Sequence, residues 1–117
     1  MAGPVGLGSA AVCQETGACK MIGVDTDQYV SAPEYADVWL TSIVKNMDVA
    51  VYNTAVNVQG IDALGNPFLG TLANDGVGIS PYHDLAGLVP AELDAAIAQL
   101  RADVVAAGGV AAFLGGE

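Results

Sequence analysis

The stretches that decide the fold are IGVDTDQ at residues 22–28 and TSIVKNMD at residues 41–48. The first has the pattern of an apolar strand that ends on an acid, Asp25. The second has the pattern of a strand that passes into a helix, with Lys45 in the first helical turn. If the two strands are parallel, Asp25 and Lys45 reach the same carboxyl edge of one sheet. Open α/β sheets bind small ligands at that edge.

The composition is that of a folded, acidic domain. The chain has 117 residues, of which 53% are hydrophobic and 14% charged. This length fits one domain or part of one, and this composition favours a buried core over disorder. Three Lys and Arg residues stand against thirteen Asp and Glu residues, for a net charge of -10. Phosphate contacts need clustered Lys and Arg, so we expect no nucleic-acid partner.

The predicted order of elements is helix, strand, strand, helix, β-hairpin and helix. We expect helices at residues 9–16, 42–59 and 90–107, single strands at 20–25 and 37–41, and a turn at 61–67. Short strands at residues 68–72 and 77–80 flank the turn signal Asn74-Asp75-Gly76 and predict a hairpin. This order indicates an α/β fold with a mostly parallel sheet flanked by helices, followed by a late β-hairpin.

Local signals set the expected helix ends and faces. Ser9 is a candidate N-cap of the first helix, and Gly17 suits the position after its end. The second and third helices each carry an apolar stripe at spacings of three and four, which predicts one buried face on each. The stripes are Ile43, Met47, Ala50, Val51, Ala55 and Val58, and Leu93, Ile97, Leu100 and Val104.

Two features could contact a ligand directly. Gly3, Gly6 and Gly8 form a glycine-rich turn before the first helix, and its N–H groups can meet an anion or a hydroxyl. A tight turn without a ligand is an equal alternative. The Asp25 carboxylate can accept two hydrogen bonds from a vicinal diol such as that of ribose. The alternative is an aspartate that caps its own loop, the role we expect for Asp27.

Lys45 is one of three basic residues and is expected where the helix dipole disfavours a cation. A neighbouring carboxylate or a ligand oxygen would account for it, and so would a surface pair with Asp48. Asp25 and Asp27 are not followed by further oxygen ligands at calcium-loop spacing. We therefore expect no metal and no cofactor.

The remaining reactive residues do not form a recognisable enzyme site. Cys13 and Cys19 are six positions apart, so they are either two buried thiols or a short disulfide, which would indicate an oxidising compartment. His83-Asp84 is expected to be loop structure, because no activated nucleophile accompanies it. Tyr29, Tyr35 and Trp39 fit the core better than a ligand stack. We predict that the chain is not an enzyme.

The runs IGVDTDQ, DVWLTSIVKNMDVAVYN and NDGVGISPYH resemble the basic membrane lipoprotein family, the PnrA-like nucleoside-binding receptors of ABC importers. The opening AGPVGLGSAAVCQETG is similar to that family's glycine-rich βα loop and helix. The closing VPAELDAAIAQLRADVVAAG is similar to its late amphipathic helix. The resemblance extends from about residue 2 to about residue 108, with the blocks in the family's order and spacing.

The resemblance implies part of a type 1 periplasmic-binding-protein fold. Residues 1–117 would be a single partial domain, chiefly the second of two lobes, and the first lobe of the same protein would be missing. Asp25 matches the family's ribose-hydroxyl acid, Lys45 its ligand-contacting lysine, and Gly6 the loop beside the sugar. The family's base-stacking residues fall mainly before Met1, so this chain alone should bind nucleosides feebly.

The resemblance also implies a setting and partners. The expected function is solute binding for an ABC importer, with a nucleoside ligand and ABC permease subunits as partners. The expected location is extracytoplasmic, with anchoring to the membrane through a lipidated N-terminus that this chain lacks. The alternative is a ligand-sensing regulatory module built on the same lobe.

Overall fold

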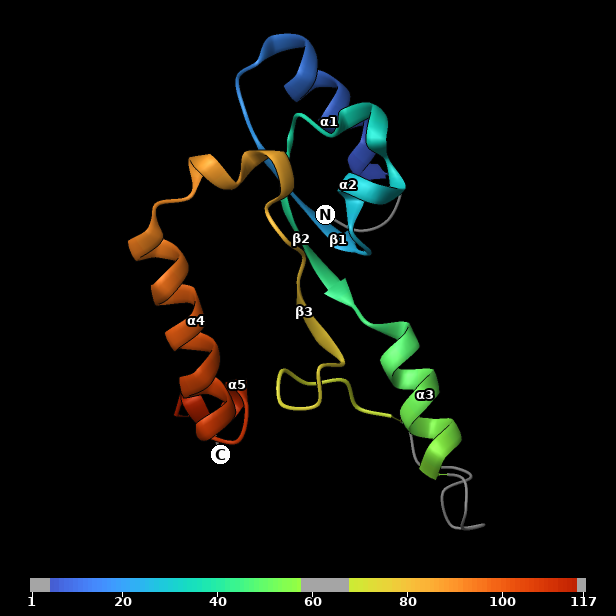
Figure 1. Ribbon diagram of the computed structural model, residues 1–117, viewed down its shortest axis with the longest axis vertical. Coiled ribbons are helices and arrows are strands. Elements are labelled where there is room, and N and C mark those ends of the chain that lie inside the picture. Colours follow the sequence, from blue (N-terminus) through green and yellow to red (C-terminus); the bar gives the residue numbers. More distant parts are fainter. Residues whose placement is uncertain (1–4, 58–67, 116–117) are drawn as a thin grey trace. The chain divides into compact units, whose positions relative to one another are not determined.

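The computed structural model describes residues 5–57 and 68–115. Its elements are α1 (Val5–Thr16), β1 (Met21–Asp25), α2 (Gln28–Ser31), η1 (Pro33–Tyr35), β2 (Trp39–Lys45), α3 (Met47–Asn57), β3 (Val77–Ile79), η3 (His83–Leu88), α4 (Ala91–Ala106) and α5 (Val110–Phe113) (Figure 1). The chain is thus a mixed α/β protein with a three-stranded open sheet. Gly3, the end of the helix predicted to residue 59 and the turn predicted at residues 61–67 lie outside the described residues.

The sheet has the order β1-β2-β3. β1 and β2 are parallel, as predicted, and the register places Val24 opposite Ile43 and Asp25 opposite Val44. β3 runs in the opposite direction to β2, because Ser80 N donates to Ser42 O (2.8 Å) while Asn46 N donates to Gly76 O (3.0 Å). The sheet is therefore mixed.

The boundary between β2 and the following helix differs from the prediction. Residues 42–45 continue the strand, and α3 begins only at Met47. The β-branched side chains of Thr41, Ile43 and Val44 suit a pleated strand. Bonds to a distant segment also fix Ser42, whose N–H donates to Ser80 Oγ at 2.9 Å. Lys45 is consequently the last residue of a strand and not part of a first helical turn.

The predicted hairpin is wrong. Residues 68–71 do not form a strand, and β3 pairs with β2 instead. The side chain of Asn74 holds a tight turn, because its Oδ1 accepts from Thr71 N (2.8 Å) and Gly76 N (3.0 Å). These local bonds satisfy backbone donors that a hairpin ladder would have used, and the exposed edge of β2 supplies β3 with its partner.

The first helix begins earlier than predicted, so Ser9 is not its N-cap. Gly6 and Gly8 lie inside α1 although glycine disfavours a helix by about 1 kcal/mol relative to alanine. Gly6, Ala10 and Cys13 are all buried, and their spacing of four and three places them on one face of α1. Gly17 follows the helix with a φ of +63°, as expected for a residue that ends it.

Cys13 and Cys19 form a disulfide, with their Cα atoms 5.1 Å apart. This confirms the sharper of the two expectations for the cysteines. The bridge joins the last turn of α1 to the segment that leads into β1. It therefore fixes how the chain leaves the helix and enters the sheet.

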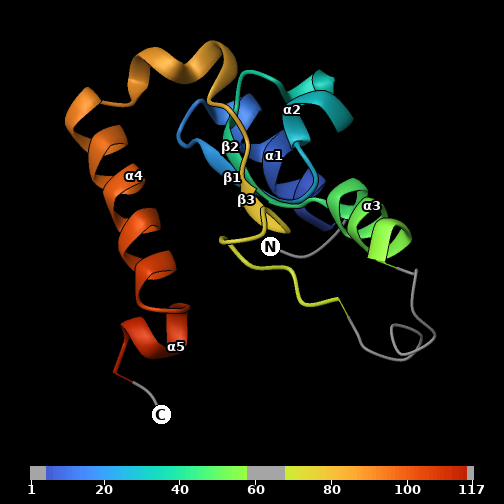
Figure 2. The same cartoon turned by 60° about the horizontal axis from the view of Figure 1, so that its bottom comes forward.

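The described chain forms two compact units. The first unit is Met1–Val44 with Ile79–Ile97, and the second is Lys45–Gly78 with Ala98–Glu117. In the first unit α1 lies against β1, as Figure 2 shows. Within the described residues, no helix is both long enough and apolar enough to cross a bilayer.

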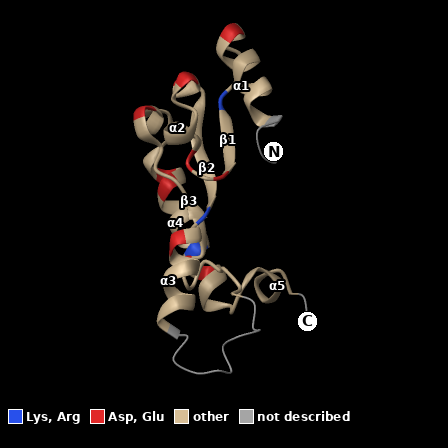
Figure 3. Cartoon of the chain, turned by 90° about the vertical axis from the view of Figure 1, so that its right-hand side faces the viewer, with Lys and Arg blue, Asp and Glu red and all other residues tan. Residues whose placement is uncertain are grey.

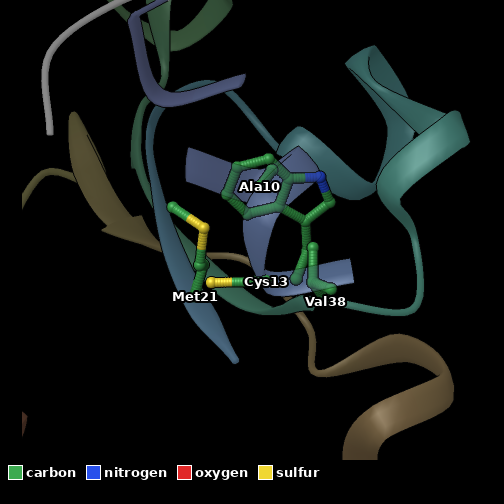
Figure 4. Close-up of a cluster of buried hydrophobic side chains, with 5 residues drawn as sticks. Ala10, Cys13, Met21 and Val38 are labelled. Atoms are coloured by element: carbon green, nitrogen blue, oxygen red, sulfur yellow. The ribbon is translucent and has the colours of Figure 1, made fainter. Parts of the chain in front are cut away.

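The core of the first unit lies between α1 and the sheet. Ala10 and Cys13 from α1 meet Met21, Val38 and Trp39, and all five side chains are buried (Figure 4). Leu7, Tyr29 and Tyr35 pack against this cluster. Burial of one large apolar side chain such as Trp39 stabilises the fold by about 1.5–3 kcal/mol. The expectation that these aromatic residues belong to the core is confirmed for Trp39.

The predicted helix stripes are largely exposed. In α3 the side chains of Met47 and Val51 are 67% and 66% exposed, and in α4 Leu93 and Leu100 are each 50% exposed. Val104 is the buried member of the α4 stripe. An amphipathic stripe becomes buried only where a second apolar element covers it. The segment after Gly109 contains the short helix α5.

Candidate ligand site at the carboxyl end of β1

Asp25 ends β1 in a left-handed conformation, with a φ of +76°. Few residues other than glycine adopt this region, although aspartate tolerates it better than most. The bend turns the chain away from the sheet directly after the acid. The partly buried Asp25 therefore lies at the carboxyl end of the parallel pair, opposite Val44, as the sequence predicted.

The turn after Asp25 is tied to both neighbouring strands. Gln28 N donates to the fully buried Ser42 Oγ (3.0 Å), and Gln28 Nε2 donates to Val24 O (3.1 Å). Gly23 permits this close approach, because a Cβ atom there would lie 2.5 Å from Ser42 Oγ. The glycine in the IGVD run thus has a packing role in positioning Asp25.

Asp27 orders this turn, as expected, and it does so through both carboxylate oxygens. Oδ1 accepts from Tyr29 N (3.2 Å) and caps the short helix α2. Oδ2 lies 2.7 Å from Nε2 of His83, 56 residues away in the sequence. The side chains of His83 and Asp27 are only 22% and 23% exposed. Partial burial reduces the screening of this pair by water and salt.

Tyr29 completes a connected group of four residues. Its ring stacks on the His83 imidazole, with centroids 4.1 Å apart and planes 9° apart. Its hydroxyl donates to Asp84 Oδ2 at 2.8 Å. This hydrogen bond raises the pKa of Tyr29 above its ordinary value of 10.0, and desolvation and the Asp84 charge act in the same direction. We call Asp27, Tyr29, His83 and Asp84 the clamp.

Sequence reasoning did not predict the clamp. His83-Asp84 was expected to be loop structure and Tyr29 to belong to the core. Tyr29 does pack against the core cluster, and the fold also brings it together with His83 and Asp84 at the turn after β1. The local signals were the acid two positions after the strand and the Pro81-Tyr82-His83-Asp84 turn. Neither identifies the other, because only the pairing of β3 with β2 brings residues 80–84 beside residues 25–29.

The other two predicted ligand residues have defined backbone positions. Lys45 ends β2 and directly follows Val44, the residue opposite Asp25. Gly6 is buried in the first turn of α1, where helix N–H groups have no intrahelical acceptor. Gly6 lines a hollow of about 10 Å³ with Ile22, Gly23 and Trp39, room for roughly one water molecule.

A larger, mainly apolar hollow of about 280 Å³ lies in the second unit. It is lined by Gly70–Ala73, Val77 and residues at the end of α4 and the start of α5, such as Val104 and Val110. None of the three predicted ligand residues lines it. It is therefore separate from the site predicted at the end of β1.

Few charged residues lie within the strands. Figure 3 shows Asp and Glu distributed over helices, turns and strand ends. In residues 5–57 and 68–115, His, Cys, Asp and Glu form no group of three or more that could hold a metal ion. The expectations of no metal and no enzyme activity stay predictions.

No protein-family model matches the sequence, and no curated protein and no solved structure is significantly similar to it. The resemblance to nucleoside-binding receptors therefore rests on the sequence motifs themselves. What it implies about ligand, partners and location is carried forward as a proposal.

Proposed function

We propose that the chain is part of the nucleoside-binding receptor of an ABC importer and that Asp25 binds the sugar hydroxyls. One observation carries this proposal: Asp25 ends β1 opposite Val44 of the parallel strand β2. Ligands of α/β proteins bind beyond the carboxyl ends of such strands. A carboxylate at that position can accept hydrogen bonds from both hydroxyls of a ribose diol.

The two other ligand contacts in the proposal come from the resemblance. Lys45, at the end of β2, donates to a ligand oxygen, and an N–H group in the first turn of α1 at Gly6 contacts the ligand beside the sugar. The chain supplies chiefly the second lobe of a type 1 periplasmic-binding-protein fold. A first lobe supplies the base contacts, so each lobe alone buries only part of the ligand.

The Cys13–Cys19 disulfide supports the extracytoplasmic part of the proposal. Disulfides persist in oxidising compartments and are rare in the cytosol. In this setting a lipid-anchored receptor delivers its ligand to the permease subunits of the importer. A sensor built on the same lobe would bind the same ligand, so copurification with permease subunits distinguishes the two roles.

Saturation-transfer NMR on this chain tests the proposal, because the method detects weak ligands. Guanosine, inosine and adenosine at millimolar concentration should each show transfer, strongest at the ribose protons. The 2′,3′-dideoxy analogues should show little, because they lack the diol that Asp25 would bind. Asp25→Asn should reduce the transfer, whereas the matched control Asp48→Asn on α3 should not. Equal transfer to ribose and dideoxy nucleosides, or none to any nucleoside, would reject the proposal.

A further inference from the structure

The carboxylate of Asp27 is held from two sides by segments far apart in the sequence. Oδ1 accepts from Tyr29 N within the turn, and Oδ2 contacts His83 Nε2 at 2.7 Å. The Tyr29 ring stacks on the His83 imidazole, and the Tyr29 hydroxyl donates a hydrogen bond to the carboxylate of Asp84, the residue after His83. The contacts form a closed circuit, so each side chain restrains the next.

One residue of the clamp and one residue just before it have left-handed backbone conformations. His83 has a φ of +43°, and Asp25, two residues before Asp27, has a φ of +76°. Such conformations persist where the surrounding contacts determine them, and they concentrate at functional sites. At His83 those contacts are the bond to Asp27 and the stack on Tyr29. At Asp25 the constraint is the turn at residues 26–28.

That turn has little freedom to move independently of Asp25. Gln28 is bonded to Val24 O on one side and to Ser42 Oγ on the other. Asp27 is the residue of the turn whose side chain reaches out of this local network to His83. Asp27 thereby links His83 to the turn that follows Asp25.

We propose that His83 is a positioning residue of the ligand site, which acts through Asp27 to fix the orientation of Asp25. This inference rests on the proposed function. His83 itself need not contact the ligand. Its bond to Asp27 orders the turn before the ligand binds, so binding loses less conformational entropy. A clamp with a purely structural role would stabilise the fold but leave the affinity of the folded protein unchanged.

The test compares three variants of the full chain by ¹⁵N–¹H NMR, with guanosine as the probe. His83→Phe keeps a ring against Tyr29 but loses the bond to Asp27, whereas His83→Gln restores a donor. Asp75→Asn is the matched control, because it breaks the 2.6 Å ion pair with Arg101 in the second unit. The amide resonances of residues 25–28 report the turn, a guanosine titration reports affinity, and urea unfolding reports stability.

We expect His83→Phe to shift the amide resonances of residues 25–28 and to weaken guanosine binding about tenfold, the effect of one lost bond to a charged group. His83→Gln should bind within about threefold of the wild type, because it restores much of that bond. Asp75→Asn should match the wild type in both measurements. If His83→Phe fails to fold, Asp27→Asn makes the same comparison, since its amide oxygen can still cap α2.

Three outcomes would overturn the inference. They are unchanged resonances of residues 25–28 in folded His83→Phe, changed resonances with unchanged affinity, and binding by His83→Gln as weak as by His83→Phe. A wild-type chain that binds no nucleoside would reject the proposed function instead. The resonances of residues 25–28, which need no ligand, would still decide whether His83 holds the turn.

Discussion

Replacement of Gly23 by alanine tests how tightly the turn after β1 is packed. The added Cβ atom would lie 2.5 Å from Ser42 Oγ and 2.9 Å from Gln28 Cβ, and nearer still to Gln28 Cγ. Ser42 Oγ cannot withdraw freely, because it accepts the hydrogen bond from Gln28 N. The extra methyl group therefore either strains the packing or breaks that bond.

The structure sets the expected magnitude. Overpacking by one methyl group costs about 1–3 kcal/mol, and loss of the Gln28 N bond adds about 1 kcal/mol. We expect Gly23→Ala to lower the free energy of unfolding by about 2–4 kcal/mol. Trp39, the only tryptophan in the chain, is 2% exposed in the core of the first unit, so its fluorescence during urea unfolding reports this unit.

Gly8→Ala is the matched control. Gly8 lies in α1, and a Cβ atom there would meet nothing within 4 Å. Alanine should therefore raise the free energy of unfolding by about 0.5–1 kcal/mol through its higher helix propensity. Glycine-to-alanine substitution is therefore expected to change the free energy of unfolding in opposite directions at Gly23 and Gly8. A loss below about 0.5 kcal/mol for Gly23→Ala would refute the packing argument.

Three further predictions concern the disulfide, Tyr29 and the sheet. The double variant Cys13→Ser/Cys19→Ser should lower the free energy of unfolding by about 2 kcal/mol, since the bridge closes a short loop of six positions. Urea unfolding measures this free energy, and an unchanged value would contradict the prediction. Because the pKa of Tyr29 is raised, its contribution to stability is present below pH 10 and is lost as the pH rises through the folded-state pKa. Asp84→Asn should lower that pKa in an ultraviolet titration, whereas Asp103→Asn should not. The sheet residues Ile22, Ile43 and Ile79 are about half exposed, so we expect the chain to self-associate through this apolar surface. Analytical ultracentrifugation should show the association, and Ile22→Lys should weaken it. A monodisperse monomer at high concentration would contradict the prediction.

β1 and the position of Asp25 at its end were predictable because their sequence signals are local. An apolar run that stops on an acid defines β1 and places Asp25 at its end. The end of β2 was not predictable in the same way. Ile43, Met47, Ala50 and Val51 have helical spacing, but the bonds between Ser42 and Ser80, 38 positions apart, keep residues 42–45 in the strand. Tertiary hydrogen bonds thus outweighed a local periodicity.

The clamp was beyond prediction for a related reason. His83 and Asp27 are 56 positions apart, and neither has a neighbour in sequence that indicates the other. Their contact depends on β3 pairing with β2, whereas the sequence favoured a hairpin between residues 68–72 and 77–80. Because the sequence predicted the wrong pairing partner for β3, it gave no sign that His83 contacts Asp27.

Trp39 packs in the same buried cluster as Cys13, one half of the Cys13–Cys19 bridge, so we expect its fluorescence to respond to the redox state of that bridge. An excited indole transfers an electron readily to a nearby disulfide, which quenches its emission. Reduction of the bridge in the folded protein should therefore brighten the single tryptophan without any added dye. Emission intensity would then follow the oxidation of the protein as it matures.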